Sequence, residues 1–310
     1  MSFVVRRPGT YSLLVDAGRP QGLHVGLPRS GPADYASFAL GNALAGNVDP
    51  ESMTALELTL TGPLLQCTES HDVVVFGATF DVVHRQSALA SQQTIRPGHT
   101  FHVEAGDEIE IQSISGNQGL RGYLCVRGGF HAAPLLGSQS ALEAIQRDEV
   151  LQASASPWRT SRWINLEPWS EASEAIRLLP GTHLTDPLRK LLLQTSFTVR
   201  PESNRMGLRL TSSTTWPTES KELVSAPVVP GTLQLPPGSQ PILLGVEAQT
   251  IGGYPRLGHT ITPDLNTIGQ ARPGDTLRFA FVTLEEAEKL QHSYHSWLQH
   301  WCTRLLEYRL

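Results

Sequence analysis

The chain has 310 residues, of which 40% are hydrophobic and 17% charged, a balance typical of folded globular proteins. This length suits two domains of roughly 150 residues each. The formal net charge of −5 provides no basic surface, so we expect neither nucleic acid nor an anionic membrane as a partner. Three widely spaced cysteines and an N-terminal stretch without a long apolar core predict a cytoplasmic protein without a disulfide framework.

Most apolar segments are short, rich in β-branched residues and bounded by Gly, Pro, Asn or Asp, a pattern that predicts strands. In chain order the clearest of these segments are residues 11–15, 72–76, 108–111, 122–126, 242–244 and 277–282. The sequence therefore predicts a mostly β protein with few helices.

Three segments have helical spacing of their apolar residues. The first covers 34–44, with Pro32 and Asp34 at its start, and the second covers 186–193, with Asp186 as its N-cap and Pro187 in the first position. The last begins at a T-x-x-E capping box formed by Thr283 and Glu286 and continues as a long apolar stripe. Such a stripe packs either on the protein's own barrel or against a partner.

Short patterns of the first half return in the second half, in the same order and at nearly constant spacing. Pro-Gly-Thr occurs at 8–10 and at 180–182, an apolar strand ending in Gly at 73–77 and at 241–245, and Gly-Asp at 106–107 and at 274–275. Coincidence among glycine-rich turns is the alternative to a true repeat. A true repeat predicts two related β barrels, as domains 1–155 and 175–310, joined through residues 152–174.

Several standard sites are missing from the sequence. It contains no Walker phosphate loop, no G-x-S-x-G elbow and no Met-Lys pair that would carry biotin. His99 and His102 lack the spacing and the neighbouring carboxylates of a metal site, so we expect no bound metal.

Three segments combine polar residues with glycine, a composition that brings backbone close to a ligand. They are residues 16–47, 203–210 and 249–275. In the second segment Arg205 and Arg209 lie four residues apart and offer an anion site. In the third, Gln, Thr and Tyr flank a Gly-Gly pair and offer hydrogen bonds to an amide or carboxylate. All three segments are also compatible with purely structural turns.

The order of these segments resembles the allophanate hydrolase subunit 2 family, also called the biotin-dependent carboxyltransferase family. In the first half the resemblance lies in D-x-G-R-x-x-G at 16–22, S-G-P-A-D at 30–34 and G-L-R-G-Y-L-C-V-R-G-G at 119–129. In the second half it lies in S-N-R-M-G-L-R-L at 203–210, G-T-L-Q-L-P-P-G-S-Q-P-I at 231–242 and Q-T-I-G-G-Y-P at 249–255. The family includes the C subunit of the bacterial 5-oxoprolinase.

The resemblance implies two tandem cyclophilin-like β barrels and a hydrolase active within a complex. That complex opens 5-oxo-L-proline to L-glutamate with ATP hydrolysis. Its other members are a KipI-type (PxpB) subunit and a LamB/YcsF-type (PxpA) subunit, and ATP, with Mg, is shared with a partner subunit. One alternative is the carboxyltransferase component of a urea-carboxylase-like enzyme, with biotin on another chain. A second alternative is a non-catalytic, KipA-like regulatory partner of a KipI-type protein.

The resemblance also suggests roles for particular residues. A carboxylate or phosphate would be held by Arg19, Arg205 or Arg209, and a proton would be moved by Asp34 or Asp264. The predicted amide-binding and other substrate-binding residues are Gln234, Gln249, Thr250, Tyr254 and Gln270.

The sequence departs from the family pattern in two places. Glu247-Ala248 stands where the family commonly has Asp-Arg, and the loop after Ser140 is shortened. The first departure removes a positive charge beside the predicted site, which favours a different substrate or a regulatory role.

Overall fold

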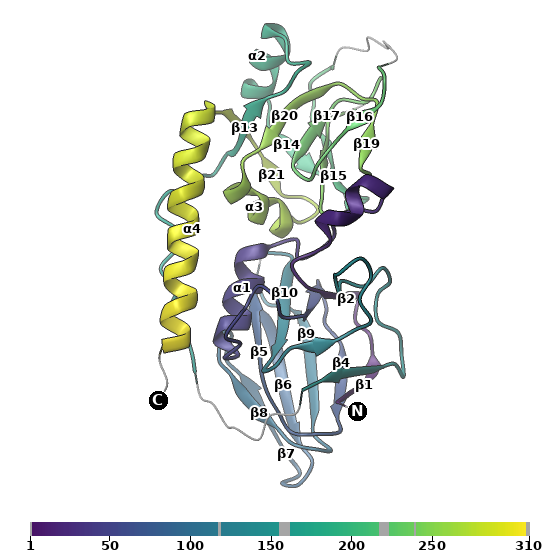
Figure 1. Ribbon diagram of the computed structural model, residues 1–310, viewed down its shortest axis with the longest axis vertical. Coiled ribbons are helices and arrows are strands. Elements are labelled where there is room, and N and C mark those ends of the chain that lie inside the picture. Colours follow the sequence, from purple (N-terminus) through teal and green to yellow (C-terminus); the bar gives the residue numbers. More distant parts are fainter. Residues whose placement is uncertain (1, 117–118, 155–161, 217–222, 239, 308–310) are drawn as a thin grey trace. The chain divides into compact units, whose positions relative to one another are not determined.

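The computed structural model describes residues 2–116, 119–154, 162–216, 223–238 and 240–307 (Figure 1). These residues form many strands and few helices, so the predicted fold class is confirmed at this level. Contacts divide the chain into two units. The first contains Met1–Arg19, Ser30–Glu167 and Leu298–Leu310, and the second contains Pro20–Arg29 and Pro168–Trp297. The main change of unit, at Glu167–Pro168, lies inside the predicted junction 152–174.

The first unit is built from two antiparallel sheets. One has the order β11-β12-β1-β4-β9-β6-β7 and the other the order β2-β3-β10-β5-β8. The strands of the first sheet are β1 (Phe3–Arg7), β4 (Leu64–Cys67), β6 (Phe80–Gln86), β7 (Ser91–Ile95), β9 (Glu108–Ile114), β11 (Phe130–His131) and β12 (Val150–Ala153). The strands of the second sheet are β2 (Tyr11–Val15), β3 (Ala55–Thr59), β5 (His71–Gly77), β8 (Phe101–Val103) and β10 (Arg121–Val126).

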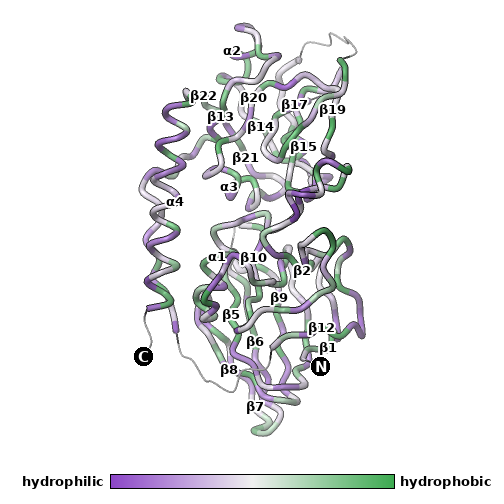
Figure 2. Tube along the Cα trace, viewed as in Figure 1, coloured by the Kyte–Doolittle hydropathy of each residue, from purple (hydrophilic) through white to green (hydrophobic). Residues whose placement is uncertain are grey.

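Alternation along the strands supplies the core of this unit. In β9, for example, Ile109 and Ile111 are fully buried while the alternating residues Glu108, Glu110 and Gln112 are half-buried. The hydrophobic stretches of β5 and α1 (Tyr35–Leu44) are green in Figure 2. Helix α1 approaches the second sheet closely at Gly41, where an added Cβ would lie 2.9 Å from Cys125 Sγ and 3.1 Å from Phe76 Cβ.

The second unit contains one eight-stranded sheet, in the order β21-β14-β15-β18-β17-β20-β13-β22. Its strands are β13 (Ile176–Pro180), β14 (Phe197–Val199), β15 (Gly207–Thr211), β17 (Thr232–Gln234), β18 (Ile242–Leu244), β20 (Arg256–Thr260), β21 (Thr276–Leu277) and β22 (Phe279–Phe281). The two edge strands, β21 and β22, are separated in the chain by Arg278 alone, so the sheet curls until it is nearly a barrel. The prediction of one strand over 277–282 is therefore wrong, because the chain passes from one edge to the other at Arg278.

A small two-stranded ribbon, β16 (Ala226–Pro227) with β19 (Ile251–Gly252), accompanies this sheet. The short helices of the unit are η1 (Pro20–Val25), α2 (Asp186–Gln194), η2 (Thr262–Asp264) and α3 (Leu265–Gln270). Helix α2 confirms the predicted segment, but its N-cap is Thr185, and Asp186 lies in the first turn. The predicted N-cap is one residue too late. The prediction took Pro187 as the first helical residue, whereas it is the second, after Asp186.

The predicted capping box of the last helix, α4 (Leu284–Glu307), is confirmed. The Glu286 carboxylate accepts hydrogen bonds from the Thr283 backbone N–H (2.7 Å) and hydroxyl (2.9 Å), and the Thr283 hydroxyl accepts one from the Glu286 N–H (3.2 Å). The apolar stripe of α4 is covered by the chain itself, with Ala287, Leu298 and Trp301 at most 8% exposed. None of the described helices is long and apolar enough to cross a bilayer.

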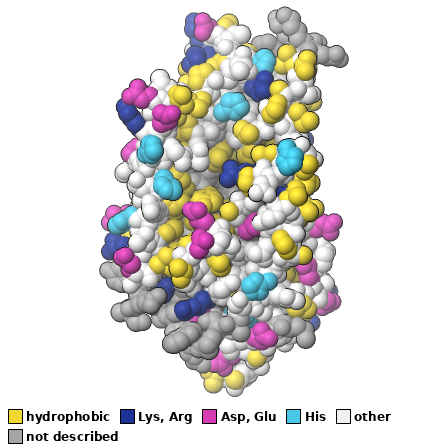
Figure 3. Space-filling model, in the orientation of Figure 1, with side chains coloured by type: hydrophobic (Ala, Val, Ile, Leu, Met, Phe, Trp, Pro, Cys, Tyr) yellow, Lys and Arg dark blue, Asp and Glu magenta, His cyan; other side chains and the backbone are white. Residues whose placement is uncertain are grey.

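The same turn occurs at Gly106-Asp107 and at Gly274-Asp275. In each, the Asp carboxylate accepts a hydrogen bond from the backbone N–H three residues earlier, and the Asp N–H returns one to that residue's carbonyl. The glycine has a φ of +92° in the first turn and +93° in the second, a conformation that favours glycine. One of the patterns that the sequence repeats is thus the same local structure in both units. Figure 3 shows acidic, basic and histidine side chains interspersed on the visible face, in keeping with the modest net charge.

Candidate functional site

One face of the eight-stranded sheet gathers several of the predicted site residues. Arg209, Ile242 and Gln234 are direct cross-strand neighbours on β15, β18 and β17. Opposed residues of antiparallel strands point to the same side, so these three side chains share one face. The ribbon covers part of it, because Val228 and Ala248 pack on Leu244 with Ile242. We call Arg209, Ile242, Gln234 and the covering ribbon the ribbon face.

Gln234 is the buried polar group of the ribbon face. Its side chain is 1% exposed, and its Nε2 makes no hydrogen bond with the described residues. Gly252 of the ribbon lies directly over it, since a Cβ added there would be 2.7 Å from Nε2. A buried amide without a partner costs about 1–3 kcal/mol. Gln234 is therefore a donor that a ligand's oxygen would satisfy.

The residues predicted to bind an amide, Gln249, Thr250 and Tyr254, flank β19 in the same ribbon. The backbone carbonyl of Thr250 stabilises the ribbon by accepting a hydrogen bond from the Val228 N–H at 2.9 Å. Gln249 is exposed, and Tyr254 is 43% exposed. These three residues thus belong to the segment that crosses Gln234 at Gly252.

The two predicted anion-binding arginines differ in their surroundings. Arg209 is exposed, and its guanidinium makes no hydrogen bond or ion pair with the described residues. The Arg205 side chain is buried, and its Nε donates to Glu247 at 2.8 Å. The glutamate that departs from the family pattern is therefore the counter-ion of Arg205, which leaves Arg209 as the more open cation.

Asp264 and Gln270 of the second unit are placed elsewhere. The Asp264 carboxylate is 5% exposed and accepts hydrogen bonds from the backbone N–H of Arg177 (2.7 Å) and from the Nε (3.0 Å) and Nη2 (2.5 Å) of its guanidinium. Gln270 is the half-buried last residue of α3. Asp264 is thus engaged in a buried ion pair that fastens η2 to β13.

Arg19 and Asp34 belong to the first unit. Asp34 is the N-cap of α1, and its two carboxylate oxygens accept hydrogen bonds from the Ser37 N–H (3.0 Å) and hydroxyl (2.6 Å). Arg19 is 1% exposed; one of its Nη atoms donates to the Ser140 carbonyl, while Nε and the other Nη make no hydrogen bond with the described residues. Arg19 retains hydrogen-bonding capacity, whereas both Asp34 oxygens are used.

The carboxylate of Asp16, close in sequence to Arg19, is extensively hydrogen-bonded and was not among the predicted site residues. Asp16 accepts bonds from the Gly18 N–H (2.9 Å), the Ser138 hydroxyl (2.6 Å), the Gln139 N–H (2.5 Å) and the Ser140 hydroxyl (2.7 Å). Burial raises the pKa of Asp16, but these hydrogen bonds outweigh it and lower the pKa below its usual value of 3.8. The spacing of Ser138 and Ser140 was the available signal, because serines two residues apart can face one carboxylate.

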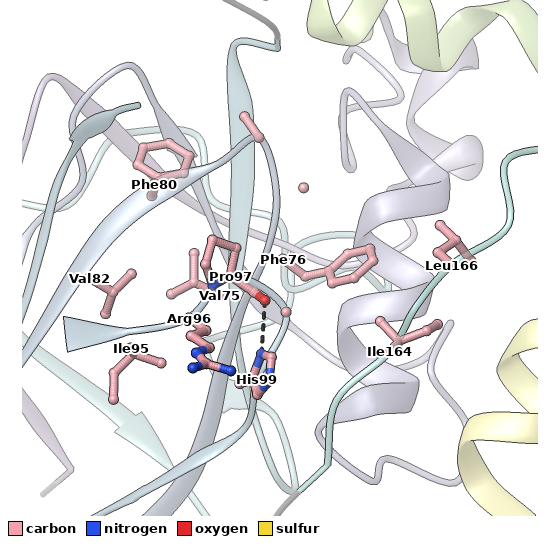
Figure 4. A pocket seen from close by; sticks show the side chains of 13 residues that line it. Val75, Phe76, Phe80, Val82, Ile95, Arg96, Pro97, His99, Ile164 and Leu166 are labelled. Atoms are coloured by element: carbon pink, nitrogen blue, oxygen red, sulfur yellow. Dashed lines mark hydrogen bonds between the residues drawn. The ribbon is translucent and has the colours of Figure 1, made fainter. Parts of the chain in front are cut away.

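The first unit also contains a pocket of about 160 Å³, and none of the predicted catalytic or substrate-binding residues lines it (Figure 4). Its lining combines buried apolar side chains, such as Phe80 and Val82, with the exposed Arg96. Residues 96–99, Arg-Pro-Gly-His, form a turn closed by the His99 N–H on the Arg96 carbonyl at 3.2 Å. The Pro-Gly pair at its centre was a readable turn signal.

Nucleophilic thiol and metal chemistry have little support in the described residues. Burial raises the pKa of the Cys67, Cys125 and Cys302 thiols, that of Cys302 to about 12, so these cysteines are protonated near neutrality. Within the described ranges no three His, Cys, Asp or Glu side chains form a group that could hold a metal ion.

The carboxyltransferase domain model, subdomains A and B, matches residues 25–281, which include the ribbon face and the pocket. This chain belongs to that family. This chain is 30% identical to the 5-oxoprolinase C subunit of Haemophilus influenzae over 296 residues, which cover 91% of this chain and 92% of the relative. It is 26% identical to the 5-oxoprolinase C subunit of Escherichia coli, covering 96% of this chain and 97% of the relative.

A solved structure has the same fold. The urea amidolyase of K. lactis superposes with a TM-score of 0.80 at 23% identity. The match covers 97% of this chain but 20% of the amidolyase chain. This likeness shows the fold of this chain. At 23% identity it gives no information on the substrate of this chain.

Proposed function

We propose that this chain is the C subunit of a heteromeric ATP-dependent 5-oxoprolinase, a hydrolase that opens 5-oxo-L-proline to L-glutamate. The observation that carries this proposal is the match to two 5-oxoprolinase C subunits along nine-tenths or more of both chains. Within the complex the chain would work with a KipI-type (PxpB) and a LamB/YcsF-type (PxpA) subunit in the cytoplasm. Each unit would be a cyclophilin-like β barrel, for which the nearly closed sheet of the second unit gives support.

The ribbon face supplies groups that suit a cyclic amide bearing a carboxylate. The Gln234 Nε2 has a hydrogen bond to give, which would go to the lactam oxygen and stabilise negative charge that develops there. Arg209 would hold the carboxylate, and Gln249, Thr250 and Tyr254 would orient the ring. Since Gly252 covers Gln234, the ribbon must shift to admit the substrate.

In this proposal ATP, with Mg, is shared with a partner subunit. Mg²⁺ bound to a nucleotide needs only one or two protein carboxylates besides phosphate oxygens and water, so the described residues are compatible with a shared site. Asp34 and Asp264 stay weaker candidates for proton transfer, because using either would break the hydrogen bonds to Ser37 or to Arg177.

The test is reconstitution of 5-oxoproline-dependent ATP hydrolysis from all three purified subunits. The expected result is activity that needs this chain and falls about 100-fold when Gln234 is replaced by Leu, a loss of roughly 3 kcal/mol of transition-state stabilisation. Arg209→Gln should raise KM more than it lowers kcat, whereas exposed Arg200→Gln serves as a matched control. No turnover with the three wild-type subunits would refute the activity, and full activity in Gln234→Leu would refute the site.

The family model itself favours a second candidate, a carboxyltransferase component of a urea-carboxylase-like enzyme. This chain carries no biotin-attachment sequence, so a biotinylated partner would have to deliver the carboxyl group. Transfer of carboxyl from such a partner to urea, with no 5-oxoproline-dependent ATP hydrolysis, would support the second candidate over the first.

A further inference from the structure

The floor of the first-unit pocket is apolar and buried. Val75, Phe80 and Val82 are 6%, 1% and 2% exposed, and Phe76 and Ile164 contribute apolar walls (Figure 4). Its volume of about 160 Å³ is close to the volume of about 150 Å³ at which an apolar cavity of another protein binds benzene. The pocket as a whole therefore has room for one ring, and water on its apolar floor would find few hydrogen-bond partners.

The mouth of the pocket carries a cation. Arg96 begins the turn at 96–99, in which Pro97 is followed by Gly98 at a φ of +67°, as a type II turn requires. The Arg96 side chain is exposed and makes no hydrogen bond or ion pair with the described residues. His99 at the end of the turn has its Nδ1 3.1 Å from the Pro97 carbonyl, so that nitrogen is already used.

The far wall is a strap formed by residues 162–166. It is fastened at Arg162, whose N–H donates to the Thr100 hydroxyl at 2.7 Å and whose carbonyl accepts the Thr100 N–H at 2.9 Å. Trp163 stacks on His99 with the ring centroids 6.1 Å apart and an interplanar angle of 12°. Ile164 and Leu166 then face the pocket. The strap thus closes one side of an apolar space whose exposed turn is cationic.

We propose that this pocket binds a small monocarboxylate that carries a five- or six-membered apolar ring. The ring would fill the floor over Phe80 and Val82 and release water from apolar surface. The carboxylate would remain at the mouth and accept two parallel hydrogen bonds from the Arg96 guanidinium. An amine on the same ring would be repelled by Arg96, and a carboxylate without a ring would leave the floor unfilled. This site is separate from the ribbon face and does not rest on the proposed function.

Benzoate is the probe for the test, titrated into the full chain by ligand-observed NMR. The expected result is saturable millimolar binding of benzoate, with weaker binding of benzyl alcohol and none of benzylamine or acetate. Arg96→Gln should weaken benzoate about fivefold, because the exposed guanidinium is screened by solvent. Ile164→Trp, which fills the pocket from the strap, should abolish binding.

Arg200→Gln, an exposed arginine of the second unit, is the matched control and should bind benzoate like the wild type. Circular dichroism shows whether each variant is folded. If Ile164→Trp is unfolded, the comparison of Arg96→Gln with the wild type still tests the proposal. Absence of benzoate binding to the wild type would overturn the proposal. Equal affinity of Arg96→Gln and the wild type would overturn the role of the carboxylate, and unchanged binding in folded Ile164→Trp would overturn the location.

Discussion

Several buried charged residues in the described part of the chain are paired with an opposite charge on a neighbouring residue. Asp264 is bound to Arg177, and Arg205 is bound to Glu247. Removing one partner of such a buried pair costs about 3–5 kcal/mol, so these residues are poorly placed to exchange protons or ligands. By contrast, the Gln234 Nε2 makes no hydrogen bond with the described residues and the Arg209 side chain is exposed, so neither group gives up a hydrogen bond when it takes a ligand. This difference, rather than residue type, selects the ribbon face.

Asp16 gives a prediction at the scale of one residue. Its folded pKa is lowered, so its hydrogen bonds contribute stability that is fully present above the ordinary pKa of 3.8 and is lost as pH falls through the lower folded pKa. We expect this contribution to be about 1 kcal/mol after allowance for solvent screening. Urea unfolding at a series of acidic pH values should show it as a decline below pH 3.8.

Asp16→Asn supplies the comparison. It should be less stable than the wild type at neutral pH, and the difference should shrink as pH is lowered. Wild type and variant losing equal stability over the acidic range would contradict the assignment.

At the scale of elements, local residue chemistry determines turns and helix starts. The Gly-Asp turns, the Arg-Pro-Gly-His turn and the capping box of α4 each follow from residues within four positions of one another. The ribbon, in contrast, depends on Gly252, whose lack of a Cβ lets it lie against Gln234 from a different strand.

Thr283→Ala gives a prediction at this scale. The change removes the hydroxyl that caps the first turn of α4 and should lower the free energy of unfolding by about 1 kcal/mol. Thermal unfolding measures the loss. Thr283→Ser keeps the hydroxyl and should retain most of the stability; a serine variant as unstable as the alanine variant would show that the methyl group, not the cap, matters.

The sequence allowed the local elements to be predicted and left the tertiary pairs unpredicted. β2, β18 and the start of α1 were predicted to the residue or nearly so, because alternation and a cap are read within one short window. The separation of β21 from β22 at Arg278 was not, because it depends on which sheet edges the neighbouring residues join.

The candidate site shows the same limit. Gln249, Thr250 and Tyr254 were predicted from one Gly-Gly segment, and the structure places Gln234 beneath that segment. The pairing of Arg205 with Glu247 links residues far apart in the chain. A single sequence carries no signal for such a pair, so the neutralised state of Arg205 could not be anticipated.

At the scale of the whole molecule, neither unit is one continuous stretch of chain. Pro20–Arg29 belongs to the second unit although both flanks belong to the first, and α4 begins in the second unit and ends in the first. The predicted domain 1–155 lies in the first unit except for this excursion, and the predicted domain 175–310 contributes its last residues to the first unit.

Deletion of the chain from Leu298 onward gives a prediction at this scale. It removes Leu298, Trp301 and Leu305, each at most 8% exposed, which should cost up to roughly 5 kcal/mol by area burial. Hydrogen exchange should show lost protection first in the strands of the first unit. Leu284→Ala, at a 62% exposed position of the same helix, is the control and should change little. Loss of protection confined to the second unit would contradict the grouping.

The return of α4 to the first unit has a consequence for biosynthesis. A ribosome adds about 5–20 residues per second and releases the N-terminal part of a chain first. Most of the first unit precedes the second unit in the chain, yet the first unit receives Leu298, Trp301 and Leu305 only after the second unit has been translated. Until then the nascent first unit exposes the apolar surface that these side chains cover, and a translational pause or premature stop before Leu298 would leave that surface open to chaperones and proteases.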